Sequence, residues 1–251
     1  MRGMLAHVAL LLALLVSAIP AHADAAAAPR DDARLTRGDA VFALATGAAV
    51  ALAMTQDRWA TRQVASADGA TANGLASTAE RLGNTGVVGP TLVGFDLVAR
   101  ASGHPHVGAA TERVALSVAA VGVSTILLKQ VVGRSRPYES PDDPYHFTAF
   151  SGHTSFPSGH TSVAFAVAGA LSCESRARWV PWVTLPAASA VAWSRVHDRA
   201  HWLSDVVAGG AWGWWASRKV DRLARTRWPD GLWVLVVPHR DGATLRLDAH
   251  F

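Results

Sequence analysis

The sequence contains one cysteine among its 251 residues, and this scarcity limits how the fold can be held together. The lone thiol, Cys173, excludes an intramolecular disulfide. Its neighbours Leu171, Ser172 and Glu174 offer no setting that would lower the pKa of a thiol, so we expect a buried packing role. Charged residues are also few, at 17%, whereas 50% of residues are hydrophobic. This balance excludes a disordered chain, and the length suits one domain with a sizeable core.

Lysine is nearly absent, since only Lys129 and Lys219 occur, and no long run of Lys and Arg is present. The formal net charge of +4 and the sequence pI of about 10.0 suit anionic small molecules or an anionic lipid surface. A surface that binds a polyanion usually has a denser basic cluster. We therefore expect no nucleic-acid partner.

The N-terminus has the composition of a signal peptide. Arg2 supplies the positive start, residues 8–19 form a short apolar core, and Ala21-His22-Ala23 matches the small-x-small cleavage rule. We expect cleavage after Ala23, which exports the chain. An uncleaved anchor is the alternative, although the apolar core is short for a membrane span of about 20 residues. Residues 24–37, rich in alanine and then charged, are expected to form a flexible leader.

Six apolar segments follow at short intervals and predict helices of three to five turns. They are Val41–Met54, Val87–Val98, Val114–Leu128, Val163–Cys173, Trp179–Trp193 and Leu203–Ala216. Their Val and Gly content leaves a β-strand open for any single segment. The repeated length and weak alternation nevertheless favour an all-α fold, an antiparallel helical bundle over residues 38–228.

The longest irregular stretch is Ser135–Pro157, whose dense prolines predict an ordered loop of the kind that often carries function. The last residues change character. A β-favouring run at Leu232–Val237, a turn signal at Asp241-Gly242 and an alternating run at Thr244–Phe251 predict a β-hairpin. We expect residues 229–251 to form a hairpin appendage to the helical domain.

Three motifs carry residues suited to phosphate chemistry. In the first, Lys129 precedes Arg136-Pro137 by seven positions, so that the two cations share one face if the helix persists. Arginine offers a planar fork for phosphate oxygens and lysine a point charge. Alone, this spacing is also explained by basic residues that stabilise a helix C-terminus.

The second motif, Pro157-Ser158-Gly159-His160, directly precedes an apolar helix. A helix N-terminus attracts anions through its free N–H groups, and Gly159 allows close approach. Ser158 can cap the helix and donate its hydroxyl to a phosphate oxygen, and His160 can protonate a leaving oxygen. A plain helix start explains the same four residues equally well.

The third motif places Arg195 at the end of one helix, and His201 and Asp205 four positions apart at the start of the next. A carboxylate on the same face can accept the Nδ1 proton of His201 and leave Nε2 free to attack. Taken alone, such a pair is usually a surface or capping pair. In an antiparallel bundle, however, all three motifs fall at the same end and can gather their cations and histidines around one phosphate.

The three motifs together resemble the type 2 phosphatidic acid phosphatase superfamily, which also contains bacterial acid phosphatases and vanadium haloperoxidases. The matching segments are KQVVGRSRP, PSGH and SRVHDRAHWLSD, within residues 129–205. The resemblance implies a helical bundle of the acid phosphatase and haloperoxidase type, and a phosphatase that needs no metal or other cofactor. By resemblance, His201 is the nucleophile, Asp205 its orienting partner and His160 the acid. The phosphate-binding residues would be Lys129, Arg136, Ser158, Gly159 and Arg195.

Several alternatives stay open from sequence alone. A vanadate-dependent haloperoxidase would use the same ligands, but the chain is short and lacks a long extra domain. A non-catalytic exported binding protein is a third class, and the complete set of catalytic residue types argues against it. His153 and His197 lie near the motifs, but their spacing fits no zinc pattern.

The substrate is expected to be a phosphorylated small molecule or a lipid. The tryptophan-rich late segments suit either core packing or a belt at a lipid interface. The apolar segments, at 11 to 15 residues, are short for membrane spans. We therefore expect a periplasmic bundle that touches the membrane, with its active site facing the periplasm. A multi-span membrane protein is the alternative.

Overall fold

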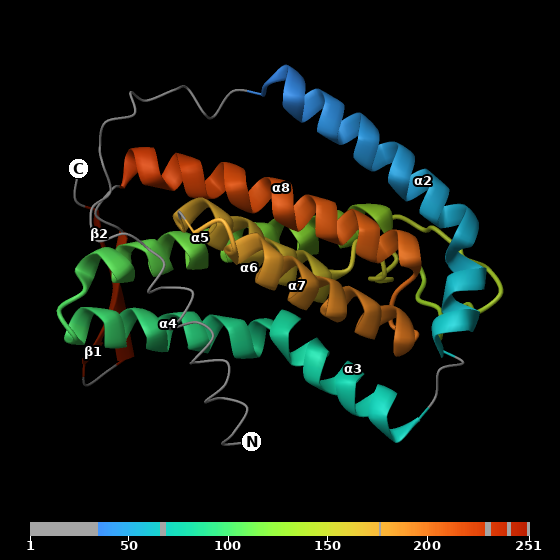
Figure 1. Ribbon diagram of the computed structural model, residues 1–251, viewed down its shortest axis with the longest axis horizontal. Coiled ribbons are helices and arrows are strands. Elements are labelled where there is room, and N and C mark those ends of the chain that lie inside the picture. The colour runs from blue at the N-terminus through green and yellow to red at the C-terminus, as the bar shows by residue number, and fades with distance from the viewer. Residues whose placement is uncertain (1–34, 66–68, 176, 229–231, 240–241, 250–251) are drawn as a thin grey trace.

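The computed structural model describes residues 35–65, 69–175, 177–228, 232–239 and 242–249, which form a helical bundle and a two-stranded hairpin (Figure 1). The helices are α2 (Arg37–Ala65), α3 (Ala70–Gly83), α4 (Thr85–Ala101), α5 (Pro105–Val132), α6 (Gly159–Glu174), α7 (Val180–His197) and α8 (Leu203–Arg227). Strands β1 (Leu232–His239) and β2 (Gly242–Ala249) pair antiparallel, with Leu232 opposite Ala249. The all-α class is confirmed, and the hairpin is present. The expected signal peptide lies outside the described residues.

All six apolar segments form helices, although Trp179 is the N-cap of α7, and two of the helices extend well beyond their segments. The segment Val41–Met54 lies within a helix of 29 residues and Val114–Leu128 within one of 28. Polar and charged residues at the ends of these helices hid their true length in the sequence. Helix α3 was not predicted, because its sequence ATANGLASTAERLG has no apolar run.

Helix α6 lies at the centre of the bundle and packs against α5, α7 and α8. The largest core cluster joins valines of α5, among them Val114 and Val121, to Val163 and Leu171 of α6. Helix α8 approaches α6 so closely that a Cβ at Gly213 would lie 2.2 Å from the carbonyl oxygen of Ser162. Glycine is therefore required at this contact, which holds the first half of α8 against the start of α6.

One end of the bundle gathers the C-termini of α5 and α7 and the N-termini of α6 and α8. The loop between α5 and α6 covers this end, at the right of Figure 1, and the hairpin lies at the other end. The starts of α6 and α8 are joined directly, because the Ser158 N–H donates to the Asp205 carbonyl oxygen at 3.0 Å. The antiparallel topology therefore brings the three sequence motifs together, as predicted.

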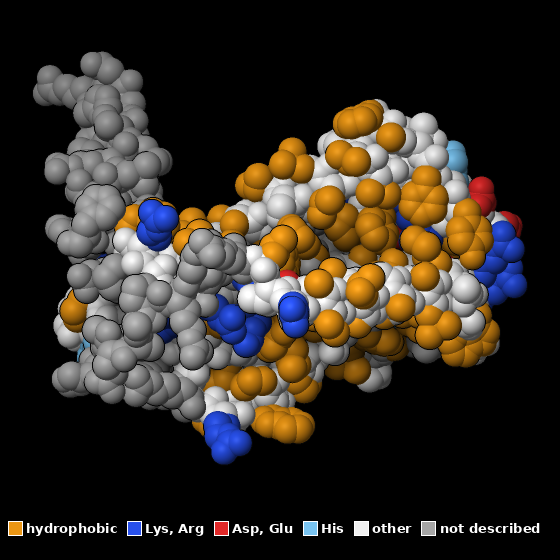
Figure 2. All heavy atoms as spheres, turned by 90° about the horizontal axis from the view of Figure 1, so that it is seen from above, with side chains coloured by type: hydrophobic (Ala, Val, Ile, Leu, Met, Phe, Trp, Pro, Cys, Tyr) orange, Lys and Arg blue, Asp and Glu red, His pale blue; other side chains and the backbone are white. Residues whose placement is uncertain are grey.

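Much of the surface is apolar. Hydrophobic side chains cover a large part of the face in Figure 2, where few acidic side chains are visible. Leu44 of α2, Leu97 of α4 and Ile126 of α5 are 76%, 62% and 60% exposed. The segments Arg37–Val64 and Pro105–Val132 are long and apolar enough to cross a membrane by length and composition. Their length corrects the expectation that every apolar segment is too short for a span.

Candidate active site

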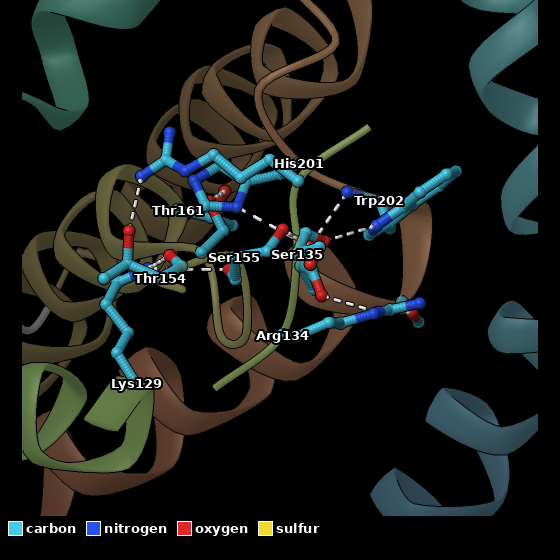
Figure 3. Close-up of polar contacts among 12 residues, drawn as sticks. Lys129, Arg134, Ser135, Thr154, Ser155, Thr161, His201 and Trp202 are labelled. Atoms are coloured by element: carbon cyan, nitrogen blue, oxygen red, sulfur yellow. Dashed lines mark hydrogen bonds and ion pairs between the residues drawn. The ribbon is translucent and has the colours of Figure 1, made fainter. Parts of the chain in front are cut away.

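Lys129 and Arg136 meet at one loop residue, although the helix does not continue between them. Helix α5 ends at Val132 because Gly133 adopts a left-handed conformation, so Arg136 lies in the loop and not on the helical face that its spacing suggested. The Lys129 Nζ donates to the Thr154 carbonyl oxygen at 2.5 Å (Figure 3). A guanidinium nitrogen of Arg136 donates to the Thr154 hydroxyl at 3.2 Å. Thr154 thus holds both cations of the first motif.

The second motif forms the start of α6 beside these cations. Ser158 occupies the N-cap position, as predicted, but its hydroxyl makes no capping hydrogen bond and instead accepts one from the Thr161 hydroxyl at 3.0 Å. A Cβ at Gly159 would lie 3.6 Å from Cε of Lys129. The free N–H groups of the first turn of α6 and the lysine are therefore adjacent, which is a favourable arrangement for an anion.

His201 lies in the turn before α8 and not within the helix, which corrects the helical placement expected from its spacing. Trp202 is the N-cap, and Asp205, three positions on, accepts a hydrogen bond from the Trp202 N–H at 2.9 Å. The His201 Nδ1 lies 3.6 Å from the Asp205 Oδ2. This is an ion-pair distance and too long for a hydrogen bond. The ring nitrogen that faces the carboxylate is the predicted one, which leaves Nε2 on the opposite side.

Burial and hydrogen-bond contacts act differently on the protonation of His201 and Asp205. His201 is 3% exposed, and the loss of hydration lowers its pKa to about 4, although Asp205 acts in the opposite direction. Burial alone would raise the pKa of the fully buried Asp205. Contacts with His201, Arg134 and Ser155 outweigh burial and hold the Asp205 pKa below its usual value. These pKa values place a neutral imidazole next to a carboxylate.

Arg134 connects this carboxylate to α2, and sequence reasoning did not single it out. Its guanidinium donates to Asp205 Oδ1 at 2.6 Å and to Asp57 Oδ2 at 2.7 Å, and all three side chains are completely buried. The Ser204 backbone N–H donates to Asp57 Oδ1 at 2.8 Å. The available signals were an arginine inside the first motif and one aspartate just beyond the first apolar segment. Neither signal reveals that the two residues meet.

Two further site residues, Arg195 and His160, both lie close to Glu80 of α3. Arg195, at the end of α7, lies with one guanidinium nitrogen 2.7 Å from Glu80 Oε1, and it also pairs with Asp198. The Nε2 of His160 lies 3.6 Å from the same Glu80 oxygen. Glu80 was not predicted, because nothing in its local sequence distinguishes it from a surface residue.

The predicted site residues thus form one cluster at one end of the bundle. Lys129 and Arg136 lower the pKa of both His160 and His201 through their charge, although burial is the larger cause in each case. Arg195 faces His160 from α7. The arrangement places cations and helix N–H groups around two histidines, one of them backed by a carboxylate, which is chemistry suited to a phosphoryl group.

The fold and site define a helical-bundle protein with two histidines and several cations gathered at one end of the bundle. Residues 112–228 match the family model of the PAP2 superfamily, and this segment contains all three motifs. The resemblance drawn from the motifs is confirmed, because this part of the chain is similar to the PAP2 superfamily.

Curated relatives match a shorter stretch. A lipid A 1-phosphatase of Rhizobium etli is 38% identical over 100 residues, which are 38% of this chain and 42% of that protein. The putative undecaprenyl-diphosphatase YbjG of Escherichia coli K12 is 28% identical over 103 residues, which are 40% of this chain and 52% of that protein. The matches therefore span between two-fifths and about half of the length of these relatives.

Two solved structures share the fold. The crystal structure of Aquifex aeolicus LpxE has a TM-score of 0.50 and 21% identity, and the match covers 62% of this chain and 89% of that one. The first transmembrane PAP2-type phosphatidylglycerolphosphate phosphatase from Bacillus subtilis has a TM-score of 0.50 and 19% identity, with 86% and 94% covered. At these identities the likeness concerns the fold.

Proposed function

We propose that the protein is a phosphomonoesterase that needs no metal, acts on a lipid phosphate and proceeds through a phosphohistidine intermediate. The observation that carries the proposal is the meeting of His201 and its buried carboxylate with Lys129, Arg136, Arg195 and the start of α6. A phosphoryl group among these residues would have a nucleophile on one side and positive charge around its oxygens.

In the first step, Nε2 of His201 forms a bond to phosphorus as the bond from phosphorus to the ester oxygen breaks. His160 gives its proton to that oxygen, and the alcohol leaves. Asp205 stabilises the charge that develops on the His201 ring. In the second step, water gives a proton to the now neutral His160 and attacks phosphorus. The bond to His201 breaks, and inorganic phosphate and the starting histidine pair are restored.

A lipid substrate is supported by three observations. One relative is named a lipid A 1-phosphatase, and another, YbjG, is named a putative undecaprenyl-diphosphatase. Two helices are long and apolar enough to cross a membrane. A largely apolar groove of about 580 Å³ runs between α2, α5 and α8, and its lining includes Leu128, Phe156 and Pro157. These three residues adjoin Lys129 and Ser158, so an acyl chain in the groove would begin beside the phosphate site.

Membrane association follows from the same surface, and we propose that α2 and α5 contact lipid directly. Export through residues 1–23 would then place the site on the periplasmic side. Separation of cell extracts into soluble, carbonate-extracted and detergent-extracted fractions tests this placement, and recovery of the chain in the soluble fraction would contradict it.

The function is tested by phosphate release from a short-chain phosphatidic acid and from nitrophenyl phosphate, with the full chain in detergent. We expect release from both esters, unchanged after exhaustive chelation of metals. Loss of activity that a divalent cation restores would overturn the metal-free mechanism. Halide oxidation after addition of vanadate and peroxide, without phosphate release, would instead assign the chain to the haloperoxidases.

His160→Ala is expected to lower the rate on an alkyl phosphate by about 10²–10⁴-fold, the usual contribution of a general acid. A nitrophenyl ester should lose far less, because its leaving group is stable without a proton. The ratio of the two rates in wild type and variant is the measurement. An equal loss on both esters would leave His160 as a phosphate ligand only.

The rate should show a bell-shaped dependence on pH with an acidic optimum. His201 must be neutral to attack, so the acidic limb lies near its pKa of about 4. His160 must be charged to donate its proton, and burial together with Arg195 lowers the pKa of His160 below 6.5. The rate should therefore fall as the pH rises through this lowered pKa. In the unfolded chain His201 takes up a proton near pH 6.5, so the free energy of unfolding decreases as the pH drops from 6.5 to 4. Initial rates must therefore be measured, so that unfolding at acidic pH does not distort the profile. A flat profile between pH 4 and 8 would contradict these assignments.

A further inference from the structure

Glu80 is a carboxylate that lies in the site but belongs to none of the three motifs. It is on α3, outside the segment that matches the family model. One oxygen, Oε1, lies 2.7 Å from a guanidinium nitrogen of Arg195 and 3.6 Å from Nε2 of His160. Because one atom faces both the proposed acid and a proposed phosphate ligand, the position of Glu80 affects two groups that the chemistry needs.

Helix α3 is held firmly in this position. A Cβ at Gly83 would lie 2.5 Å from the carbonyl oxygen of His160, so glycine permits the end of α3 to touch the first turn of α6. At the other end of α3, the Asn73 side-chain oxygen lies 2.9 Å from Nε2 of the buried His197, on α7. The helix is therefore fixed to both α6 and α7, and Glu80, between these two contacts, is directed at the gap between them.

The charges around His160 give Glu80 a particular role. Burial is the largest influence and disfavours the charged imidazole, and Arg195 from α7, Lys129 from α5 and Arg136 from the loop act in the same direction. Of the four charged groups with the largest influence on the His160 pKa, Glu80 is the one that favours the charged form. The Nε2 atom of His160 is buried and makes no hydrogen bond to any described residue, so its interaction with Glu80 is purely electrostatic.

We propose that Glu80 is a positioning residue that keeps His160 protonated for transfer to the leaving alcohol and holds Arg195 toward the phosphate. This inference rests on the proposed phosphatase activity and adds a carboxylate to its acid side, in parallel with Asp205 on the nucleophile side. Arg195 has a second carboxylate partner, Asp198, three positions further along the chain. Asp198 therefore offers a matched control, since its pairing with Arg195 does not involve His160.

The test compares Glu80→Gln with Asp198→Asn and Glu80→Asp in the full chain, with hexyl phosphate and nitrophenyl phosphate as substrates between pH 4 and 9. Glu80→Gln should move the alkaline limb for hexyl phosphate down by about one pH unit, which lowers the rate on that limb about tenfold. Nitrophenyl phosphate should lose less than about threefold there, since it needs little protonation. Asp198→Asn should leave the limb in place, and Glu80→Asp should restore part of the shift.

If Glu80→Gln lowered the rate equally on both esters and left the alkaline limb of the pH profile in place, the proposed role of Glu80 would be overturned. A shift of the alkaline limb in Asp198→Asn as large as that in Glu80→Gln would also overturn it. Thermal unfolding of each variant excludes a loss of fold as the cause, and Glu80→Asp provides a charged variant should Glu80→Gln be unstable. Wild-type chain that releases phosphate from neither ester would contradict the proposed function itself. Active wild type with an unaffected Glu80→Gln variant would contradict only the present inference.

Discussion

Replacing His201 with alanine is expected to lower phosphate release by on the order of 10⁴-fold or more, the scale seen when an enzyme loses its nucleophile. The other proposed ligands would still bind phosphate, but no group would remain to form the covalent intermediate. Rapid quenching of the wild type with labelled substrate should trap a phosphorylated protein, and the variant should trap none.

The control for this experiment is His104→Ala, at the start of α5 and therefore at the end of the bundle away from the site. It removes an imidazole of the same size, and we expect wild-type turnover. Circular dichroism and thermal unfolding should show that the His201 variant keeps its fold. Wild-type turnover in a folded His201→Ala protein would remove this residue from the nucleophile role.

Replacing Arg134 with methionine is expected to destabilise the fold by about 3–5 kcal/mol, as is usual when one member of a buried ion network is removed. Asp57 and Asp205 would remain buried without the guanidinium that now bonds to both. Denaturant unfolding in a fixed detergent measures the difference in the free energy of unfolding. Phosphatase activity should also fall, because Asp205 would lose the contact that fixes its orientation toward His201.

The chain offers a matched control in Arg62→Met. Arg62 of α2 pairs with Asp142 of the same loop that carries Arg134, at 3.5 Å, but the two side chains are 71% and 87% exposed. An exposed pair of this kind contributes about 0–1 kcal/mol. Equal destabilisation by the two substitutions would contradict the role of burial. A double variant, Arg134→Met with Asp57→Asn, should recover part of the loss because one uncompensated charge is removed.

The sequence predicted the structure best where chemically distinctive residues lie next to apolar runs of helical length. Apolar runs predicted six helices, and the order of the motifs predicted that Lys129, His160 and His201 would gather at one end. Local rules gave the wrong result at two places. The left-handed Gly133 ends α5 before Arg136, and Trp202 begins α8 after His201. Both errors arise because residue spacing was treated as helical across a helix end.

The residues missed altogether are those whose partners are distant in the chain. Asp57 and Arg134 are separated by 77 positions, and Glu80 meets Arg195 across two intervening motifs. No pattern within a short stretch of sequence predicts that two such distant residues make contact. Helix α3, which carries Glu80, was also missed because it packs through small residues such as Ala76 and Ala79 instead of an apolar stripe.

The pairing of Asp57 also has a consequence for how the protein is made. Asp57 is synthesised long before its partners, since Arg134 follows 77 positions later and Ser204 147 positions later. Contacts of such separation form late, because a long loop must close first. Helix α2, an apolar helix with two acidic side chains, Asp39 and Asp57, therefore stays undocked until Ser204 has been synthesised. Its docking should be among the last steps of assembly, and it should complete the surroundings of Asp205 at the same moment, because Arg134 bonds to both carboxylates.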